Sequence, residues 1–259
     1  MVDTHEFFQE IVHTKQRVPS IFCYTNEQLQ DMKNFITSKF GKLGIDRTSN
    51  LGQFYVTTIV FKKHWLILKE TKNNPIFLGP LFLHQQTDYN TYRAFFNKLS
   101  SELQSDIDLE LRIPEIKELG TDDEKVLIKA LEHSFPNSTR YLCTKHLKDN
   151  IKYYMTNKAT IPTKERGTIT QLIFDTGLCN ANDTFTFEQI SSQITSTTSN
   201  TQFIDYFNNF FKTQVNNYVH QPNLNAKTSG LWTNNNAESI NNVLKINTNW
   251  KPQSLTALI

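Results

Sequence analysis

Three acidic residues, Asp46, Asp122 and Glu238, occur in the segments LGIDRT, LGTDDE and TNNNAES. Three carboxylates that converge on one point can hold two divalent metal ions, and two such ions can drive attack on a phosphodiester bond. Carboxylate oxygens are hard ligands that suit Mg²⁺ or Mn²⁺ rather than zinc. The first question is therefore whether the fold brings these three carboxylates together.

Each acid also has an ordinary structural explanation. Asp46 could be a turn residue before the loop that follows it. Asp122 and its neighbour Asp123 could cap the next helix, and either carboxylate could be the one that faces a metal. Glu238 could be the last residue of a capping box with Asn235 at the N-cap. Only the three acids taken together, in this order, favour the catalytic interpretation.

Between the last two acids, Cys143 and His146 have the Cys-x-x-His spacing of metal ligands. Two ligands do not make a zinc site, and the sequence offers no partner pair. The alternative is a buried thiol next to a histidine that forms hydrogen bonds near the acidic site. The pair is therefore expected to lie beside the site, with its role open.

Three lysines and a tryptophan are candidates for contact with nucleic acid. Lys145, Lys148 and Lys152 share one face of an expected helix and could contact phosphates, although a solvated helix face is the commoner reason for such a pattern. Trp232, just before the glutamate segment, could stack on an unpaired base. Packing in the core is the alternative for Trp232.

The composition limits the partners of the chain. With 27 basic and 25 acidic residues the net charge is +2, whereas a DNA-binding module usually carries a strongly basic stripe. Contact with DNA would therefore be local. The three cysteines are widely spaced, which predicts a reducing intracellular compartment without a disulfide framework. No apolar run is long enough to span a bilayer, so no membrane contact is expected.

The elements that would position these residues follow from hydrophobic spacing. Thr25 and Gln28 form a capping-box pattern. Residues 49–52 have the length and chemistry of a hairpin turn, and residues 65–68 either extend the strand before them or begin another. Pro80 indicates an edge strand or a bulge. In chain order, we expect a helix over residues 25–37, strands over 41–46, 54–61 and 76–84, a helix over 89–103, a strand over 115–122, a helix over 124–135, a strand over 140–143, a helix ending near 155 and a last helix over 234–246.

This order predicts an α/β fold with a mixed sheet and flanking helices. A Thr-, Ser-, Asn- and Gln-rich stretch interrupts it, and its aromatic segments indicate a helical insertion with a core made by Phe207, Phe210 and Phe211. The expected divisions are a helical lead-in over residues 1–40, the first part of the sheet domain over 41–155, the insertion over 156–230, and a truncated last part over 231–259 that carries Glu238.

Five segments together resemble the Mutator-like (MULE) transposases: LGIDRTSNLGQFYVT, LGPLFLH, GTDDEK, FPNSTRYLCTKHLKDN and TNNNAESINNVLK. The resemblance covers most of residues 20–259 and is weakest over 156–230. It implies a ribonuclease-H-like core with a catalytic triad of Asp46, Asp122 and Glu238. The triad would bind two Mg²⁺ or Mn²⁺ ions, one activating water or a 3′-hydroxyl and the other stabilising the leaving 3′-oxygen.

Members of that family cut DNA at transposon ends and join the ends to target DNA. The resemblance therefore implies both DNAs as partners, a homo-oligomer in the active state and a nuclear location. Cys143-x-x-His146 matches a recurrent signature of the family, whereas Asp123 replaces a residue that is often small there. The zinc-binding modules that flank the core in full-length members are absent. Alternatives are a transposase-derived DNA- or protein-binding regulator without catalysis, or an inactive transposon remnant.

Overall fold

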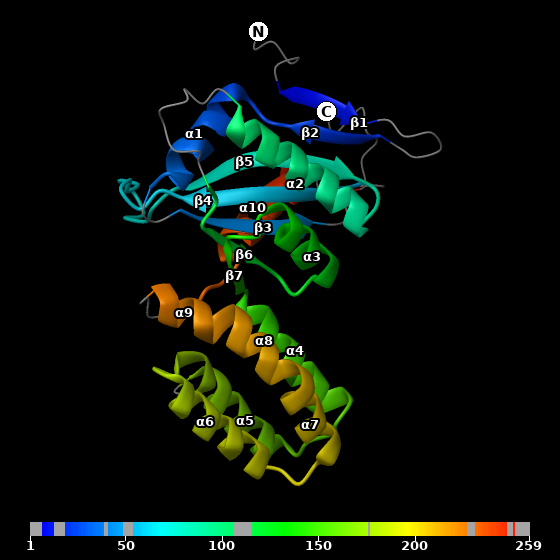
Figure 1. The fold of residues 1–259 in the computed structure, drawn as a ribbon, viewed down its shortest axis with the longest axis vertical. Coiled ribbons are helices and arrows are strands. Elements are labelled where there is room, and N and C mark those ends of the chain that lie inside the picture. The colour runs from blue at the N-terminus through cyan, green and yellow to red at the C-terminus, as the bar shows by residue number, and fades with distance from the viewer. Residues whose placement is uncertain are drawn as a thin grey trace. The chain divides into compact units, whose positions relative to one another are not determined.

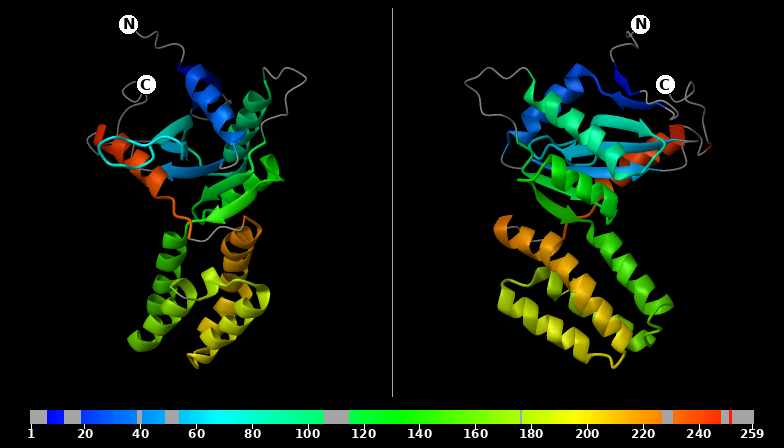
Figure 2. Two further views of the ribbon diagram at one scale, coloured as in Figure 1. Left: turned by 90° about the vertical axis from the view of Figure 1, so that its left-hand side faces the viewer. Right: turned by 45° about the vertical axis from the view of Figure 1, so that its right-hand side comes forward.

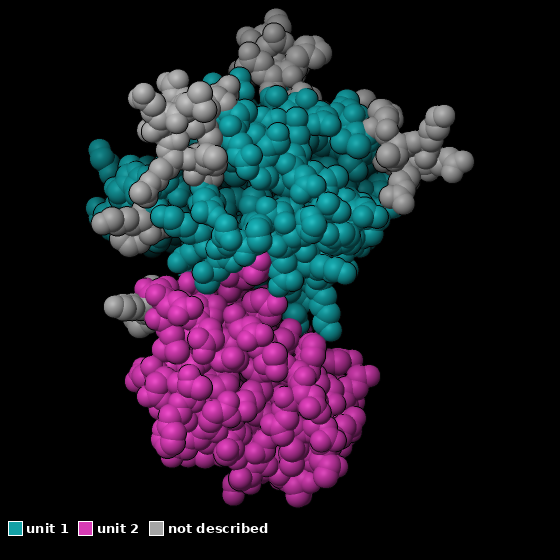
Figure 3. Space-filling model, in the orientation of Figure 1, with its two compact units in different colours: residues 1–139, 234–259 teal, residues 140–233 magenta. Residues whose placement is uncertain are grey.

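The computed structural model describes residues 7–12, 19–38, 41–48, 54–105, 115–175, 177–226, 231–247 and 251. The chain is an α/β protein that divides into two compact units (Figure 3). Unit 1 comprises residues 1–139 and 234–259, and unit 2 comprises residues 140–233. Unit 1 is therefore built from two separate stretches of the sequence.

Within the described residues, seven strands form one mixed sheet in the order β1-β2-β5-β4-β3-β6-β7. Pairing is antiparallel from β1 through β2, β5 and β4 to β3, and parallel between β3 and β6. The strands are β1 (Phe8–Val12), β2 (Ser20–Cys23), β3 (Lys42–Thr48), β4 (Tyr55–Lys62), β5 (Ile76–His84), β6 (Glu118–Thr121) and β7 (Thr139–Leu142). The central position of β4 explains why its residues are buried on both faces.

Helices cover both faces of this sheet (Figures 1 and 2). The helices α1 (Asn26–Ile36), α2 (Tyr89–Gln104) and α3 (Lys125–Ser134) share one apolar cluster with the strands on the first face. The helix α10 (Asn235–Asn247) packs on the other face, where Leu244 contacts a second cluster. The two faces are thus covered by different stretches of the chain.

The helices on the first face begin where the sequence predicts. In α1 the Thr25 hydroxyl accepts a hydrogen bond from the Gln28 amide at 3.2 Å, and the Gln28 side chain accepts one from the Thr25 amide at 2.8 Å. This capping box satisfies two backbone donors at the helix start. In α2, Asp88 caps the helix by accepting from Thr91 at 2.9 Å. The predicted apolar stripe of α2 is buried as expected: Tyr92, Phe95, Phe96, Leu99 and Leu103.

Several predicted features differ from the structure. Residues 65–68 belong to a loop between β4 and β5, not to a strand. Pro80 lies in β5, which is an interior strand, so the edge alternative is wrong; the register with β4 is irregular there, as the bulge alternative predicts. Residues 1–40 contain β1 and β2 in addition to the expected helix. The predicted turn over residues 49–52 lies outside the described residues.

Unit 2 begins at Arg140, before the predicted start of the insertion at residue 156, and is helical apart from the end of β7. Phe207 and Phe211 are fully buried in it, as expected, and Phe210 is half-buried. In the described residues, no helix is both long and apolar enough to cross a membrane. The first helices of unit 2 are α4 (Thr144–Asn157), α5 (Thr163–Phe174), η2 (Leu178–Asn180) and α6 (Thr184–Ser196). One continuous helical stretch follows, made of α7 (Thr201–Tyr206), π-helical η3 (Phe207–Phe211), α8 (Lys212–Val215), π-helical η4 (Asn216–His220) and α9 (Gln221–Ala226).

Candidate functional site

Asp46 and Asp122 lie side by side on neighbouring strands of unit 1. The parallel pairing of β3 with β6 ends with Ile45 opposite Thr121; Asp46 is the next residue of β3, and Asp122 directly follows β6. Neighbouring strands are about 4.8 Å apart. Successive side chains in a strand point to opposite faces. Because Ile45 belongs to the cluster under α1 to α3, Asp46 points towards α10.

Two amide side chains of the α10 segment contact the two aspartates. The Asn241 Nδ2 group donates to Asp46 Oδ2 at 2.6 Å, and the Asn234 Nδ2 group donates to Asp122 Oδ1 at 3.3 Å. Asn234 Nδ2 also lies 3.4 Å from the backbone carbonyl oxygen of Ile45. Both asparagines are buried. Hydrogen bonds between amides and carboxylates therefore fix the first turns of α10 against the ends of β3 and β6.

Glu238 lies between these two contacts. It follows Asn234 by four residues and precedes Asn241 by three, and residues at these spacings share one face of a helix. The Glu238 backbone amide donates to the Asn234 carbonyl oxygen at 3.0 Å, which closes the first turn of α10. The side chain of Glu238 is half-buried. The third predicted carboxylate is thus on the helix face that meets the two aspartates.

Thr58 sets the orientation of the Asn241 amide. It lies directly opposite Asp46 in the pairing of β3 with β4. Its hydroxyl oxygen is 3.4 Å from both Asn241 Oδ1 and the backbone carbonyl oxygen of Asp46. With Oδ1 facing this hydroxyl donor, the NH₂ group of Asn241 faces the carboxylate, which can only accept.

A second polar network fixes the same strand ends on the opposite face. On that face the Nε atom of Arg47 pairs with Glu124 Oε2 at 2.9 Å, while its backbone amide donates to Asp46 Oδ1 at 2.9 Å and so links the network to the acidic site. The Tyr92 hydroxyl donates to Glu124 Oε1 at 2.8 Å. Burial lowers the pKa of Arg47, but Glu124 outweighs this effect and raises it overall. Burial and the nearby Glu124 carboxylate raise the pKa of Tyr92.

The ordinary explanations of the three acids do not describe their positions. Asp46 lies inside β3 and not in a turn. The N-cap of α3 is Glu124, so neither Asp122 nor Asp123 occupies the cap position. Asn235 is already the first residue of α10, so it is not the N-cap of a box with Glu238.

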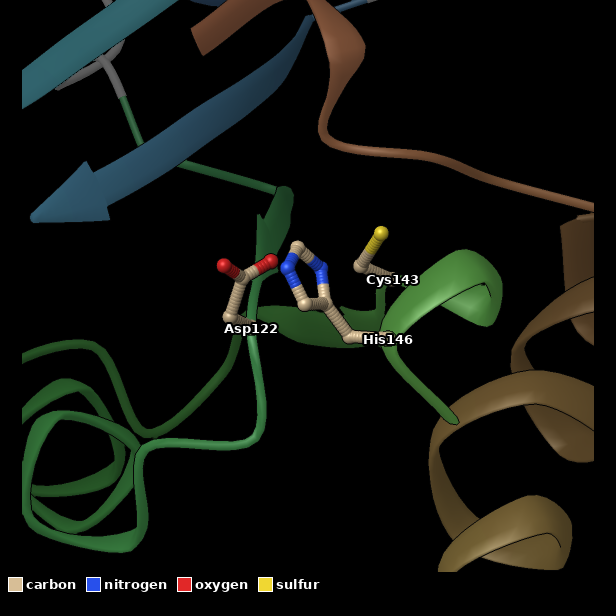
Figure 4. Close-up of side chains that lie close together, drawn as sticks. All are labelled: Asp122, Cys143 and His146. Atoms are coloured by element: carbon tan, nitrogen blue, oxygen red, sulfur yellow. The ribbon is translucent and has the colours of Figure 1, made fainter. Parts of the chain in front are cut away.

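Cys143 and His146 lie around the start of α4, Cys143 buried and His146 half-buried. Among the residues that the structure describes, Asp122, Cys143 and His146 are the group of three potential metal ligands whose ligand atoms lie within 4.8 Å of one another (Figure 4). The three predicted carboxylates do not form such a group. Cys143 and His146 belong to unit 2, whereas the three predicted carboxylates all belong to unit 1. The candidate site described here therefore consists of these carboxylates and the residues of unit 1 around them.

The candidate DNA contacts also belong to unit 2. Lys145 and Lys152 are exposed on α4. Lys148 Nζ is 3.6 Å from the Asp175 carboxylate and lies over the ring of Phe174. The positive charge of Lys148 therefore already interacts with two groups of unit 2. Trp232 is half-buried, and its carbonyl oxygen accepts from the backbone amide and the hydroxyl of Thr144 at 3.0 and 2.9 Å. No observation here assigns these four residues to DNA.

The sequence prediction missed the amides and the hydroxyl that surround the acids. Asn234, Asn241 and Thr58 were not among the predicted site residues. A signal existed for the asparagines, because positions 234, 238 and 241 have the spacing of one helix face. Thr58 could be identified only from the strand register.

Comparisons with known proteins give no further information about the chain. No protein-family model matches it, and no curated protein matches its sequence. The candidate site therefore rests on its own geometry.

Proposed function

We propose that this chain is the catalytic core of a metal-dependent DNA transposase, which cleaves phosphodiester bonds at transposon ends and transfers the strands. One observation carries the proposal. Asp46 and Asp122 directly follow the last paired residues of the neighbouring parallel strands β3 and β6, and α10 carries Glu238 between two amide contacts to them. The order of β5, β4, β3, β6 and β7, with helices on both faces, supports a ribonuclease-H-like core.

The donor set fits the metals that this function requires. Three half-buried carboxylates provide only oxygen ligands, and Mg²⁺ and Mn²⁺ prefer oxygen. Asp46, Asp122 and Glu238 would hold two such ions. When bound, the ions supply an activated attacking oxygen and charge stabilisation for the leaving oxygen.

The protein itself positions and shields these ligands. Asn241 and Asn234 hold one oxygen of each aspartate, so both carboxylates keep a defined orientation. Arg47 ties the backbone after Asp46 to Glu124 on the opposite face. This preorganisation reduces the reorganisation that a charged transition state would otherwise demand. DNA as partner, a homo-oligomer in the active state and a nuclear location belong to the same proposal.

Nicking of supercoiled plasmid DNA tests the function. We expect cleavage with Mg²⁺ or Mn²⁺, none with EDTA, and a loss of roughly 100-fold or more in Asp122→Asn and Glu238→Gln, because each removes a carboxylate charge from the site. Binding of Mn²⁺, followed by electron paramagnetic resonance, should weaken in the same variants.

Asp123→Asn is the matched control, since it removes the neighbouring carboxylate and should leave cleavage within about tenfold of the unmodified protein. Cleavage that survives both Asp122→Asn and Glu238→Gln, or that does not depend on a divalent metal, would refute the proposal.

A further inference from the structure

The loop between β4 and β5, residues 63–75, exposes four consecutive apolar side chains. Trp65, Leu66, Ile67 and Leu68 are 54, 40, 66 and 42% exposed. Single exposed apolar residues are normal on a protein surface, but a contiguous group of them marks an interaction site. We call residues 63–75 the β4–β5 loop.

The β4–β5 loop holds its own shape. The Asn74 side-chain amide donates to the Leu66 carbonyl oxygen at 2.7 Å, and the Lys72 backbone amide donates to the Leu68 carbonyl oxygen at 2.9 Å. Lys72 itself has a φ of 57°, in the left-handed region, which lets the chain turn back towards β5. Trp65 packs near Phe35, with ring centroids 6.2 Å apart. The apolar side chains are therefore presented by a fixed backbone.

The same loop contains the excess positive charge of the chain. It has three lysines and one glutamate, a net charge of +2, whereas the other 246 residues have 24 basic and 24 acidic residues. Lys69 and Lys72 are exposed, and Lys63 pairs with Asp31 at 2.9 Å. A complementary partner would place an apolar surface against the exposed apolar side chains and negative charge next to the lysines.

We propose that the β4–β5 loop is a DNA-contact element in which Ile67 and Leu68 wedge against a base step while Lys69 and Lys72 contact the flanking phosphates. Apolar side chains that insert between base pairs, next to basic residues on the backbone, are a recurrent way of gripping and bending duplex DNA. The inference deepens the proposed function and rests on it, because it concerns the DNA on which the acidic site would act.

The position of the loop favours DNA over other anionic partners. Asp46 is opposite Thr58, and β4 ends four residues later at Lys62. Four residues of a strand span on the order of 13 Å, which is about four base pairs at 3.4 Å each. Along β4, the β4–β5 loop therefore begins within about four base pairs' length of the acidic site, and both lie in the same unit.

Binding to a 30-base-pair duplex in EDTA, followed by fluorescence anisotropy, tests the inference without cleavage. We expect the double variant Ile67→Ser with Leu68→Ser to weaken binding about tenfold. Lys69→Gln with Lys72→Gln should reduce the slope of log affinity against log salt by about 2, because two phosphate contacts are lost. A 2-aminopurine base in the duplex should become brighter with the unmodified protein but not with the apolar variant.

Matched controls are Phe185→Ser, at a 78% exposed aromatic residue outside the loop, and Lys117→Gln with Lys164→Gln at two exposed lysines. If the loop variants bind DNA as tightly as these controls, or if the unmodified protein does not bind the duplex, the inference is wrong. It is also wrong if the loop variants instead abolish binding to phosphatidylserine vesicles or self-association in sedimentation, with DNA binding unchanged.

The failure of this inference can be told apart from the failure of the proposed function. Glu238→Gln should lose cleavage and keep loop-dependent binding. Loop-dependent binding by a protein that never cleaves DNA would support the loop and contradict the catalytic proposal. If the loop variants cleave DNA with metal and bind DNA as the unmodified protein does, the catalytic proposal is supported and the loop is not a DNA contact.

Discussion

At the scale of single residues, Asn241 makes the shortest of the amide contacts to the acidic site. Its amide nitrogen is 2.6 Å from Asp46 Oδ2, its oxygen faces the Thr58 hydroxyl, and its side chain is 4% exposed. The amide donor gives one oxygen of the carboxylate a hydrogen-bond partner inside the protein. Asn241 thus allows a carboxylate to be partly buried between β3 and α10.

Replacing Asn241 by aspartate should make the stability of the protein depend on divalent cations. Asn241→Asp puts a carboxylate against Asp46, and the repulsion between two like charges should cost roughly 2 kcal/mol in EDTA. Mn²⁺ should restore much of this loss, because an added cation neutralises the pair. Thermal unfolding with and without Mn²⁺ measures the effect.

The neighbouring exposed residue supplies the control for that experiment. Asn242→Asp adds the same charge to the same helix, at an exposed position, and should change the melting temperature little under either condition. Equal behaviour of the two variants would mean that Asn241 does not face the aspartate.

The sequence identified the acids of unit 1 but not their supports. Asp46, Asp122 and Glu238 could be found because carboxylates near strand ends and helix starts stand out from their surroundings. Thr58 and Asn241 do not, because threonine is common in strands and asparagine is frequent in this chain. Their role depends on the strand register and on the packing of α10, which no local pattern determines.

At the scale of the elements, the ends of β3 and β6 are fixed from both faces of the sheet. On one face, α10 contacts Asp46 and Asp122. On the other, the Arg47–Glu124 pair joins β3 to the start of α3, and Tyr92 adds α2 to the same network. The positions of the two strands at the site are therefore fixed by three helices, α10, α3 and α2.

Removal of the Tyr92 hydroxyl tests the contribution of the network behind the site. Tyr92→Phe keeps the buried ring but deletes the donor to Glu124, which should lower the free energy of unfolding by roughly 1 to 2 kcal/mol. Urea denaturation measures this change. Tyr89→Phe, at a half-buried position one turn earlier in α2, should cost clearly less.

Elements with strong local signals were predictable from the sequence, and those without were not. The capping box of Thr25 and the apolar stripe of α2 gave the correct helices. The strand β1 is short and pairs only at the edge, so its sequence carries no clear alternation. Residues 65–68 are apolar but exposed, and an apolar run by itself predicts burial in a strand.

At the scale of the whole molecule, each unit contains a buried histidine. His84 in unit 1 is completely buried, and its Nδ1 is 2.7 Å from the carbonyl oxygen of Gln86. A carbonyl can only accept, so Nδ1 carries the proton and Nε2 accepts from the Thr57 hydroxyl at 2.8 Å. Burial lowers the pKa of His84 to about 4. In unit 2, burial also lowers the pKa of His220.

Acid should therefore destabilise unit 1 well before its carboxylates are protonated. Between pH 6.5 and about 4 the unfolded chain binds a proton at His84 that the folded protein does not, so the free energy of unfolding falls as pH falls. From pH 7 to 5 the loss from this residue is roughly 2 kcal/mol. Urea unfolding, followed by hydrogen exchange in β4 and β5, measures it.

Substitutions at two histidines separate this effect from general acid sensitivity. His84→Gln should flatten the pH dependence of unit 1, whatever its effect on stability at pH 7. His64→Gln, at an exposed position, should keep the slope. An unchanged slope in His84→Gln would exclude His84 as the source of the pH dependence.

The interruption of unit 1 by residues 140–233 has a consequence for the order of synthesis. The ribosome completes both aspartates and the strands that carry them before it makes unit 2, and only afterwards makes α10. At 5 to 20 residues per second, unit 2 takes roughly 5 to 20 s. During this interval Asp46 and Asp122 have been made and Glu238 has not. Glu238 can therefore join Asp46 and Asp122 only after all of unit 2 has been made.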